Sequence, residues 1–568
     1  MTAPTRMSRF FLKTLREAPA EAELPSHRLL LRAGLVMPLA AGLYCFTPLG
    51  WRAMRRVEEL VREEMNRAGA QELRLPALQP LELWDKSGRS QIFGGALYRL
   101  SDRRDRNFVL APTHEEAISA LAASQVQSYR DLPVTLYQFQ QKFRDEPRPR
   151  GGLIRLREFC MKDAYSFDPD WETLDGSYQA MFDAYARIFE RAEVPALPVE
   201  ADSGAIGGKD SQEFIYLNEN GEDEVLLCPS CGYAANAEKA TFRPEPPVKA
   251  EPAPAERVDT PGVATIASLA AFLGIEERQT VKAVFYAADG EPVFVAIRGD
   301  LEVNETKLRN LLKAVELEPM DDGAVERAGL VAGSASPVGL EGMPVVADTS
   351  ATTAPNLVGG ANERDAHLLN LNYGRDWTAT FVDDIALAEG GHGCPNCEGK
   401  LEVRSGMELG HVFKLGTSYA EALDVRYLDG EGERQYAVMG CYGIGVDRLL
   451  AAILEANHDE DGITWPRTLA PFDVHVVVLG GEKPEVAEAL SELEGALEEA
   501  GLEALVDDRD ESPGAKFKDA DLLGMPVRLT VSPRALGRGG IELRDRTSGE
   551  SEVVSIGEAV GRIGAGGS

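Results

Sequence analysis

A run of basic and aromatic residues stands out between Lys142 and Lys162. It holds seven basic and three acidic residues, although the whole 568-residue chain has a formal net charge of −33. Such a local reversal of sign favours an anionic ligand. If LYQFQQKFRDE forms a strand, alternate side chains share a face, and one face is polar throughout, at Gln138, Gln140, Lys142, Arg144 and Glu146. That face suits a polar ligand, and it would equally suit solvent.

The segment LIRLREFCMKD adds an aromatic ring among arginines. On a strand, one of its faces would carry Arg155, Arg157, Phe159, Met161 and Asp163. A ring and guanidinium groups can sandwich a purine and neutralise phosphates. Between the two segments lies FRDEPRPRGG, which indicates the tip of a hairpin. The hairpin either reaches over a nucleotide or is simply solvated.

A glycine-rich segment near the other end of the chain offers a second phosphate contact. AVMGCYGIGVDRLLAAI leads from a predicted strand through Gly440, Gly443 and Gly445 into a predicted helix with Arg448 in its first turns. Glycines let the backbone approach a ligand closely, and an arginine can hold a phosphate beside a helix N-terminus. The segment is neither G-x-G-x-x-G nor a Walker motif. Close packing of the helix is the alternative explanation.

Four of the seven cysteines form two CxxC pairs, at Cys228 and Cys231 and at Cys394 and Cys397. An odd number of cysteines without a dense framework indicates reduced thiols in a cytoplasmic protein. In such a chain, paired CxxC motifs predict a zinc site before disulfides. If all four share Zn²⁺, the residues between the pairs form an insertion whose two ends meet. The alternative is two tight turns with unliganded thiols.

Composition excludes some classes of protein. The length predicts three to four domains, and the acidity argues against an unselective nucleic-acid binder. Residues 33–51 are uncharged, but two prolines and three glycines favour a buried strand and turn over a membrane span. The N-terminus has no long apolar stretch and no cleavage site, so we expect no signal peptide, no membrane association and a cytoplasmic location.

Element signals divide the chain. Residues 51–69 predict an amphipathic helix with a closing glycine, and a strand should follow and stop at Pro76. Residues 243–261 are rich in Pro, Ala and Glu and predict a linker. An α+β pattern with a hairpin around Asp289 and Gly290 then continues to about Asp384. From about Ala470, alternating strands and helices predict a small α/β domain with a largely parallel sheet.

Several motifs in order resemble one family. FRDE, RLREFCMKD and GCYGIGVDR resemble motifs 2 and 3 of the class II aminoacyl-tRNA synthetases, and the helix and strand ending at Pro76 resemble motif 1, which forms the dimer interface. APTHEEAI, ADSGAIGG and ELGHVFKLGTSYAEAL narrow the resemblance to the bacterial prolyl-tRNA synthetases. The likeness covers nearly the whole chain.

The resemblance implies an α+β fold in four segments. An antiparallel-sheet catalytic domain would occupy 1–229 and 394–470, an inserted α+β editing domain with the Pro-rich linker 230–393, and an α/β anticodon-binding domain 471–568. It also implies a homodimer that takes ATP, Mg²⁺, proline and tRNA(Pro).

Residue roles follow from the same resemblance. Arg144 would bind the α-phosphate of ATP and the substrate carboxylate, and Arg448 the γ-phosphate. Glu146 would accept from the adenine amino group, Phe159 would stack on adenine, and Arg155 would contact ATP. The proline pocket would comprise Thr113, Glu115, Asp163 and His411, with Arg144 at the carboxylate. Thr113 could form a capping box with Glu116, and both roles can hold, since the cap would leave Glu115 facing the pocket. His411 could be a buried structural residue.

The resemblance also implies two further sites. A pocket that fits proline admits alanine, because a few methylenes discriminate by only about 1–3 kcal/mol, so a hydrolytic editing site is expected. Lys282 would engage the tRNA end, and Asp348 and His367 would place water, although Lys282 could be an ordinary exposed lysine. In the last domain, Arg509, Lys516 and Lys518 would contact tRNA, or lie on a solvated helix face.

Two other functions compete with a proline-specific ligase. PTHEE and MKDAYSF disfavour another class II synthetase, because they match the proline enzymes and not merely the class. A non-catalytic tRNA-binding paralogue would be expected to have lost an ATP contact, yet Arg144, Glu146 and Arg448 are all present.

Overall fold

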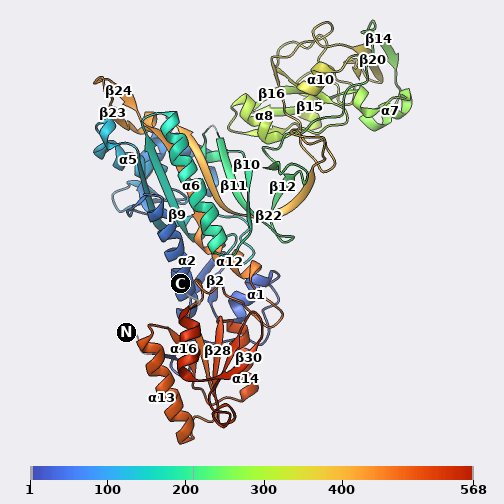
Figure 1. The fold of residues 1–568 in the computed structure, drawn as a ribbon. Helices are drawn as coiled ribbons and strands as arrows, with labels where there is room; N and C mark the ends of the chain where they lie inside the picture. The colour runs from blue at the N-terminus through green and yellow to red at the C-terminus, as the bar shows by residue number, and fades with distance from the viewer. Residues whose placement is uncertain (1–3, 209, 566–568) are drawn as a thin grey trace. The chain divides into compact units, whose positions relative to one another are not determined.

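The computed structural model describes residues 4–208 and 210–565 and divides the chain into two compact units (Figure 1). Unit 1 combines the chain up to Leu197 with Ser203–Asn220 and with the chain from Met407 onward. Unit 2 comprises Pro198–Asp202 and Gly221–Gly406, and so encloses the insertion expected at 230–393. Among the described residues, no helix is long and apolar enough to cross a membrane.

The catalytic part of unit 1 is built on antiparallel strands, which confirms the α+β class. β9 pairs with β8 on one side and with β25 on the other, and β25 pairs with β22. A short parallel strand, β4, extends the edge beyond β8. These strands are β4 (Gln71–Glu72), β8 (Val134–Phe143), β9 (Glu158–Asp168), β22 (Glu402–Gly416) and β25 (Val438–Gly445).

Helices cover both faces of this sheet because its strands alternate apolar residues (Figure 1). Ala164 and Tyr442 join the core with α2 (Pro48–Arg67), α6 (Trp171–Arg191) and α12 (Val446–Ala456). Their neighbours along the strands, Tyr165 and Cys441, join a second core with α5 (Glu115–Gln125) and α11 (Ser418–Leu423). The sheet is therefore buried on two sides, and any polar side chain on it needs a partner.

The predicted motif 1 helix is confirmed as α2. Thr47 caps it by accepting a hydrogen bond from the Gly50 amide at 3.2 Å, and Pro48 takes the first helical position. Gly69, at φ +81°, ends it in the left-handed region that glycine adopts at little cost. The strand predicted to follow is only two residues long, and β5 (Leu78–Pro80) begins beyond Pro76.

The expectation of a buried strand in 33–51 is wrong. The segment forms a hairpin of β2 (Val36–Ala40) and β3 (Leu43–Phe46). Most of β2 is exposed, with Met37 at 52% and Leu39 at 70%. The absence of charge in this hairpin therefore does not reflect burial within the described chain.

Smaller elements complete the catalytic part. A three-stranded sheet holds β5, β6 (Arg99–Ser101) and β7 (Asn107–Leu110) beside α3 (Leu81–Lys86) and α4 (Arg89–Ile92). The remaining elements are α1 (Pro25–Arg32), β10 (Ala196–Ala201), β11 (Asp210–Leu217), β23 (Arg426–Leu428) and β24 (Arg434–Tyr436).

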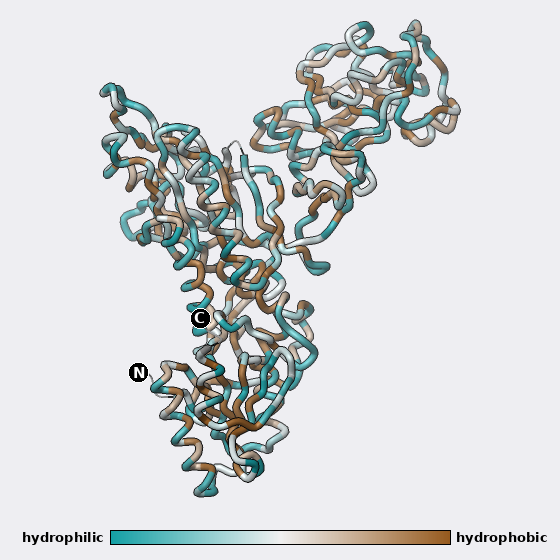
Figure 2. The backbone as a smooth tube through the Cα atoms, in the orientation of Figure 1, coloured by the Kyte–Doolittle hydropathy of each residue, from teal (hydrophilic) through white to brown (hydrophobic). Residues whose placement is uncertain are grey.

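The C-terminal part of unit 1 has the predicted alternation. Its sheet runs β1-β27-β26-β28-β29-β30, parallel from β1 to β28 and antiparallel beyond. The central strands are apolar and buried (Figure 2). β1 (Thr5–Arg6) joins from the other end of the chain, which the sequence did not indicate. The elements are β26 (Val474–Val478), α13 (Pro484–Glu499), β27 (Ala504–Asp507), α14 (Pro513–Leu523), β28 (Val527–Val531), α15 (Pro533–Leu536), β29 (Ile541–Asp545), β30 (Ser551–Val554) and α16 (Ile556–Ala565).

Unit 2 contains the predicted hairpin, formed by β15 (Val281–Ala288) and β16 (Glu291–Arg298). Its turn, Asp289–Gly290, has positive φ at both residues, as a two-residue hairpin turn requires. The sheet runs β17-β15-β16-β18-β21, with β17 (Leu317–Pro319), β18 (Val345–Asp348) and β21 (Phe381–Asp383). Its helices are α7 (Ile266–Leu273), α8 (Glu305–Leu312), α9 (Asp322–Arg327) and α10 (Thr349–Thr353).

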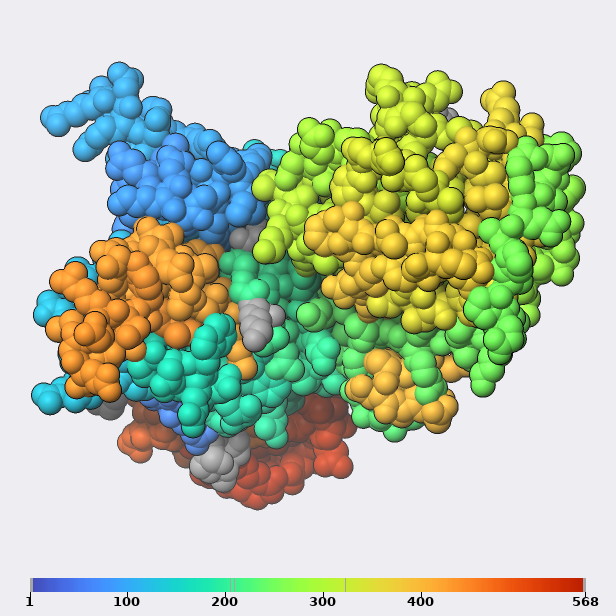
Figure 3. All heavy atoms as spheres, turned by 90° about the horizontal axis from the view of Figure 1, so that it is seen from above, coloured from blue at the N-terminus to red at the C-terminus, as the bar shows by residue number. Residues whose placement is uncertain are grey.

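The predicted linker at 243–261 is only partly irregular. Residues 244–255 have no regular structure and lie over the outside of unit 2 (Figure 3). Residues Glu256–Asp259 form β14, which pairs with β20 (Ala366–Leu371) beside β19 (Leu357–Gly360). β-branched Val258 and the end of the proline run explain why pairing begins there.

Ile453, fully buried in α12, tests the packing beneath the sheet. Ile453→Ala should lower the stability of this region by about 2–5 kcal/mol, because it removes buried methyl groups and leaves a cavity. Hydrogen exchange of α12 and β9 amides measures the loss as a fall in opening free energy. Leu428→Ala, at a residue 45% exposed, is the control; equal losses in both variants would contradict the packing.

Candidate active site

The predicted hairpin of motif 2 is present. β8 and β9 stay in register from Val134↔Phe167 to Phe143↔Glu158, and residues 144–157 form the loop. The loop is closed by paired hydrogen bonds between the backbones of Arg150 and Arg155. Gly151 and Gly152 both have positive φ, which permits the sharp reversal. Arg144 and Glu146 therefore lie just beyond the strand end.

Arg144 is a half-buried cation with unmet hydrogen-bonding capacity. Its Nη2 donates to the Pro112 carbonyl at 3.4 Å, and its Nε is buried without a partner among the described residues. Its guanidinium carbon lies 5.3 Å from the centre of the Phe159 ring. Burial lowers the pKa of Arg144, which means that the charge is poorly compensated. A guanidinium in this state is suited to an anionic ligand.

Glu146 and Phe159 flank Arg144 at the base of the loop. Arg155 Nε lies 3.0 Å from Glu146 Oε2. Burial acts to raise the pKa of Glu146, but the hydrogen bond from Arg155 holds it below its usual value. Glu146 is thus an anion that can accept a hydrogen bond, beside a half-buried aromatic ring.

Arg448 enters from motif 3 and binds Glu408, which the sequence analysis had not selected. Its Nη1 donates to the Glu408 carboxylate at 2.9 Å and to the Glu408 carbonyl at 2.7 Å. Burial acts to raise the pKa of Glu408, but the hydrogen bond from His411 and the charge of Arg448 hold it well below its usual range. The charges of both Arg448 and Glu408 affect the pKa of Arg144, so motifs 2 and 3 lie close together.

His411, Glu408 and Glu213 form a cluster of metal-ligating atoms within 4.8 Å of one another. His411 Nδ1 lies 3.3 Å from Glu408 Oε1 and 3.5 Å from Glu213 Oε1. Its ring stacks on Phe413 at 3.8 Å, and its Nε2 is buried without a partner among the described residues. The two carboxylates beside Arg448 are a donor set that suits Mg²⁺, which prefers oxygen ligands.

A buried cluster of acidic side chains, called the acidic pocket below, lies near Arg144. Thr113 donates to Glu115 Oε2 at 2.6 Å, and Arg89 bridges Glu115 and Glu116 at 3.0 and 2.9 Å. Burial acts to raise the pKa of Glu115, but Arg89 and Thr113 hold it below its usual value, whereas burial dominates and raises that of Glu116. The alternative of a capping box between Thr113 and Glu116 is not realised: His114 is the N-cap residue, and Glu116 binds Arg89 and Ser87.

Asp163 forms the other side of this pocket. It accepts hydrogen bonds from Lys142 at 2.6 Å and from Gln138 and Tyr165 at 2.9 Å. Lys142 also contacts His114 Nδ1 at 2.7 Å, and burial together with the Lys142 charge lowers the pKa of His114 to about 4. The polar face of β8 is therefore buried and bound to β9. Its alternation signalled Lys142 and Gln138, but nothing in the sequence signalled Arg89.

The geometry agrees with comparisons to known proteins. Residues 98–457 match the class II core domain of the tRNA synthetases for G, H, P, S and T, and residues 473–565 match an anticodon binding domain. Proline–tRNA ligases of Dehalococcoides mccartyi and Citrifermentans bemidjiense are 52% and 50% identical to the chain. They align over 98% and 99% of it and over 98% of each relative. The chain belongs to the proline–tRNA ligase family.

Solved structures show the same fold at low identity. Prolyl-tRNA synthetase of Giardia lamblia, in complex with prolyl-adenylate, has a TM-score of 0.57 and 16% identity, covering 94% of this chain and 73% of that one. The enzyme of Cryptosporidium parvum, complexed with halofuginone and AMPPNP, has a TM-score of 0.57 and 13% identity, covering 95% and 75%.

The predicted editing residues of this ligase-family chain lie in unit 2. Lys282 on β15 contacts Glu302 at 2.7 Å. Asp348, at the end of β18, accepts from the amides of Ser350 and Ile385 at 2.8 and 2.9 Å. Lys282 pairs with Ile297 on β16, and Asp348 follows the Ala296↔Ala347 pair, so the two residues lie at the same end of one sheet. The Asp348 side chain caps α10. Its role in placing water stays a prediction.

His367 belongs to the other sheet of unit 2, where it pairs with Val258 and Gly360. Its Nδ1 lies 2.6 Å from Thr260 Oγ1, and burial lowers its pKa. A backbone bridge between Thr280 and Val358 joins the two sheets. His367 is consequently a neutral, fixed imidazole at neutral pH.

The three cations expected to contact tRNA differ in availability. Arg509 is held by Asp507 and Asp519 at 2.7 and 2.8 Å. Lys516 is buried and donates to the carbonyls of Val478 and Asp507. Its ammonium therefore stabilises the fold and is not exposed for a tRNA contact. Lys518 is exposed.

Arg89→Met should destabilise the acidic pocket by about 3–5 kcal/mol, because it leaves two buried carboxylates without their shared cation. The amides of α5 should exchange correspondingly faster. Arg106→Met removes an exposed pair, Arg106–Asp102 at 2.6 Å, and should cost much less stability, because solvent screens exposed ion pairs. Similar losses of stability in the two variants would show that Arg89 does not stabilise the acidic pocket.

Proposed function

We propose that this chain is a proline–tRNA ligase that activates proline with ATP and transfers it to the 3′ end of tRNA(Pro). The observation that carries the proposal is the placement of Arg144. Its uncompensated guanidinium lies between a buried acidic pocket and the Arg448–Glu408 pair. One site can thus hold an amino acid by both ends and the phosphates of ATP beside it. The close relatives carry the same activity in their name.

The acidic pocket would hold the proline amine. Arg89 is a single cation shared between the carboxyl groups of Glu115 and Glu116, and it holds the pKa of Glu115 below its usual value. Asp163 is aligned on the other side by Lys142, Gln138 and Tyr165. An incoming secondary ammonium would complete the charge balance of these fixed acceptors, and Thr113 would orient Glu115 toward it.

The cationic side would hold ATP. Arg144 would bridge the α-phosphate and the proline carboxylate, and Arg448 would bind the γ-phosphate. Phe159 would stack on adenine, while Glu146, fixed by Arg155, would accept from the adenine amino group. Glu408 and Glu213, with His411 beside them, would hold Mg²⁺, which when bound neutralises charge on the pyrophosphate.

Catalysis then needs positioning and charge neutralisation, and no covalent nucleophile from the protein. The carboxylate of proline attacks the α-phosphorus in line, and the bond to pyrophosphate breaks. Arg144 stabilises the charge that develops on the α-phosphate oxygens, in a buried setting where such contacts are strong. The terminal ribose hydroxyl of tRNA then attacks the carbonyl of the adenylate, and AMP leaves.

Arg144→Ala should reduce proline-dependent ATP–pyrophosphate exchange by at least about 10²-fold, because it removes a preorganised donor from the transition state. Circular dichroism and hydrogen exchange should stay unchanged, since Arg144 makes one weak hydrogen bond to the fold. Arg148→Ala, at an exposed position in the same loop, is the control and should retain exchange. Unaltered exchange in Arg144→Ala would sink the assignment, and exchange with another amino acid but not proline would redirect it.

We also propose that unit 2 hydrolyses alanyl-tRNA(Pro). Support comes from Lys282 at the same sheet end as Asp348 and from a neutral His367 fixed by Thr260. Lys282 would bind a phosphate of the tRNA end in place of its exposed partner Glu302. His367 would help shape the pocket.

Lys282→Ala should slow deacylation of alanyl-tRNA(Pro) by about tenfold, as expected for one lost charge-assisted contact of roughly 1.5 kcal/mol. Proline-dependent pyrophosphate exchange should be unchanged. Lys249→Ala, at an exposed lysine of the linker, serves as the matched control. The editing role of Lys282 fails if both variants deacylate at the wild-type rate.

We further propose a cytoplasmic homodimer. The exposed apolar hairpin of β2 and β3, with Met37 and Leu39, lies next to the start of α2, where Trp51 is 46% exposed. This is the segment that resembles motif 1, and a second copy of the chain would cover it.

Arg148 and Arg150, exposed on the motif 2 loop, would meet the acceptor end of tRNA.

A further inference from the structure

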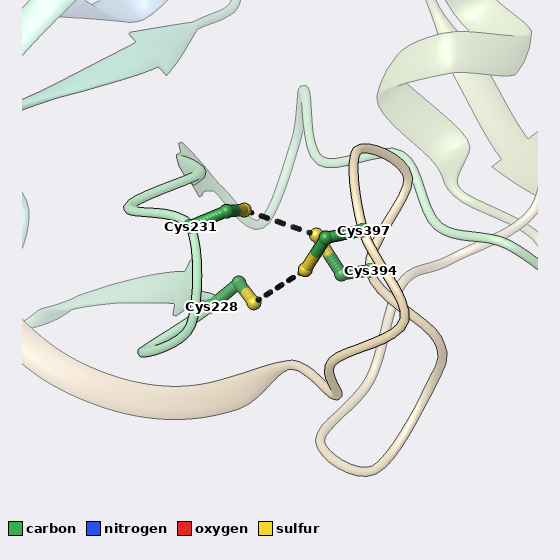
Figure 4. Close-up of side chains that lie close together, drawn as sticks. All are labelled: Cys228, Cys231, Cys394 and Cys397. Atoms are coloured by element: carbon green, nitrogen blue, oxygen red, sulfur yellow. Dashed lines mark hydrogen bonds between the residues drawn. The ribbon is translucent and has the colours of Figure 1, made fainter.

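Four cysteines that the proposed ligation does not use meet in unit 2 (Figure 4). Cys228 directly follows β12 (Asp223–Leu227), and Cys394 and Cys397 precede β22. The Sγ atoms of Cys228 and Cys397 are 3.6 Å apart, as are those of Cys231 and Cys394. All four Sγ atoms lie within 4.8 Å of one another.

These separations match the edges of a metal tetrahedron. With Zn–S bonds of about 2.3 Å, the edge of a regular ZnS₄ tetrahedron is about 3.8 Å. A disulfide would bring two sulfurs to about 2.0 Å, and all four cysteines are free thiols. Each close pair also joins one CxxC motif to the other, so the two motifs contribute equally to the cluster.

The two motifs have the same backbone turn. The Cys228 amide donates to the Tyr233 carbonyl at 2.8 Å, and the Cys394 amide donates to the Gly399 carbonyl at 2.9 Å. In both turns the first cysteine therefore bonds to the residue five positions on. Backbone amides also point at sulfur in the second turn, from Asn396 to Cys394 Sγ at 3.4 Å and from Gly399 to Cys397 Sγ at 3.3 Å. Such donors stabilise thiolates, the form that binds metal.

Gly399 marks how closely the chain passes the sulfurs. A Cβ at this position would lie 2.9 Å from Cys228 Sγ and 3.2 Å from Cys397 Sγ. Any side chain would therefore push two of the four sulfurs apart. The glycine is required by the convergence of the thiols and not by its own backbone conformation, since its φ is not positive.

The core around these turns is too small to hold them by itself. Its buried members are few and mostly small: Leu226, Cys228, Tyr233, Ala235, Ala240, Ala388, Cys394 and Leu401. Two are the cysteines themselves. A shared metal would add a cross-link where apolar burial contributes little to offset the entropy of ordering the chain.

We propose that Cys228, Cys231, Cys394 and Cys397 bind one structural Zn²⁺ as thiolates. The site would have four protein ligands and no open coordination position, so its role would be structural. It would hold the two CxxC turns of unit 2 together. β12 and the start of β22 pair from Asp223↔Gly406 to Leu227↔Glu402, and the metal would clamp the end of this ladder. It would thereby join parts of the chain 163 and 169 residues apart, a loop whose closure is entropically costly.

The first test measures zinc in the full-length protein by mass spectrometry after dialysis, for wild type, Cys231→Ser, Cys397→Ser and Cys45→Ser. Cys45 is an exposed cysteine outside the cluster. Wild type and Cys45→Ser should retain about one zinc per chain, and the other two variants should lose it. Wild-type protein without zinc, or zinc retained equally by all four proteins, would overturn the proposal.

A second measurement uses wild-type protein alone, in case the cysteine variants do not fold. Co²⁺ added to the apo-protein should give the intense visible and thiolate charge-transfer bands of a tetrahedral tetrathiolate site. Chelation should raise hydrogen exchange in β12 and in residues 386–401, while β8 and β9 stay protected. Absence of the cobalt bands, or disulfides linking these cysteines in non-reducing peptide mapping, would contradict a zinc site. Because neither readout involves proline or tRNA, the result is independent of the proposed ligation.

Discussion

The ion pair between Lys142 and Asp163, 2.6 Å apart between β8 and β9, is the interaction on which the catalytic sheet depends. Both side chains are almost fully buried, and an isolated charge in such a place would cost several kcal/mol. The pair links β8 and β9 diagonally, since Lys142 is opposite Phe159 and Asp163 is opposite Gln138, and it supports the register of these two strands. That register in turn decides where β8 ends, and the strand end places Arg144 at the mouth of the pocket.

The other buried polar groups around this pair also have hydrogen-bonding or ionic partners. Gln138 and Tyr165 satisfy the remaining acceptors of Asp163, and His114 accepts from Lys142. Helix α5 packs on this face of the sheet through Ile118 and Ala122. Among the described residues, the carboxylates of Glu115 and Glu116 in its first turn form ion pairs with Arg89. The pocket is therefore built from groups that would be destabilising singly. Its rigidity follows from how many of them share partners, and a rigid acceptor set is what orients an ammonium.

Local signals in the sequence sufficed for elements with strong periodicity or distinctive turns. The helix at 51–69 and the hairpin around Asp289 form as predicted, because their chemistry is contained in neighbouring residues. The predicted helix that carries Arg448 also forms, but the glycine-rich segment before it is part of strand β25, which ends at Gly445, and α12 begins at Val446. The exposed hairpin at 33–51 was mistaken for a buried strand, since absence of charge does not tell burial within a chain from burial by a partner. Arg89, Glu408 and the pairing of β1 with β27 depend on residues far apart in sequence. No local pattern could indicate them. A local pattern also could not decide the partner of Thr113, whose hydroxyl donates to Glu115 and does not cap the helix.

The acidity of the chain gives the cations left uncompensated a particular meaning. With 92 acidic and 59 basic residues, most arginines and lysines can find a carboxylate within the fold. Arg89 and Arg509 have two carboxylates each, and buried Lys516 satisfies itself with backbone carbonyls. Arg144 has no ion pair among the described residues, and burial lowers its pKa. Such a half-buried guanidinium is available to an external anion, which is the role proposed for Arg144 above. A negatively charged chain can therefore hold ATP without a broad basic surface, because the attraction is confined to a site that its own carboxylates cannot occupy.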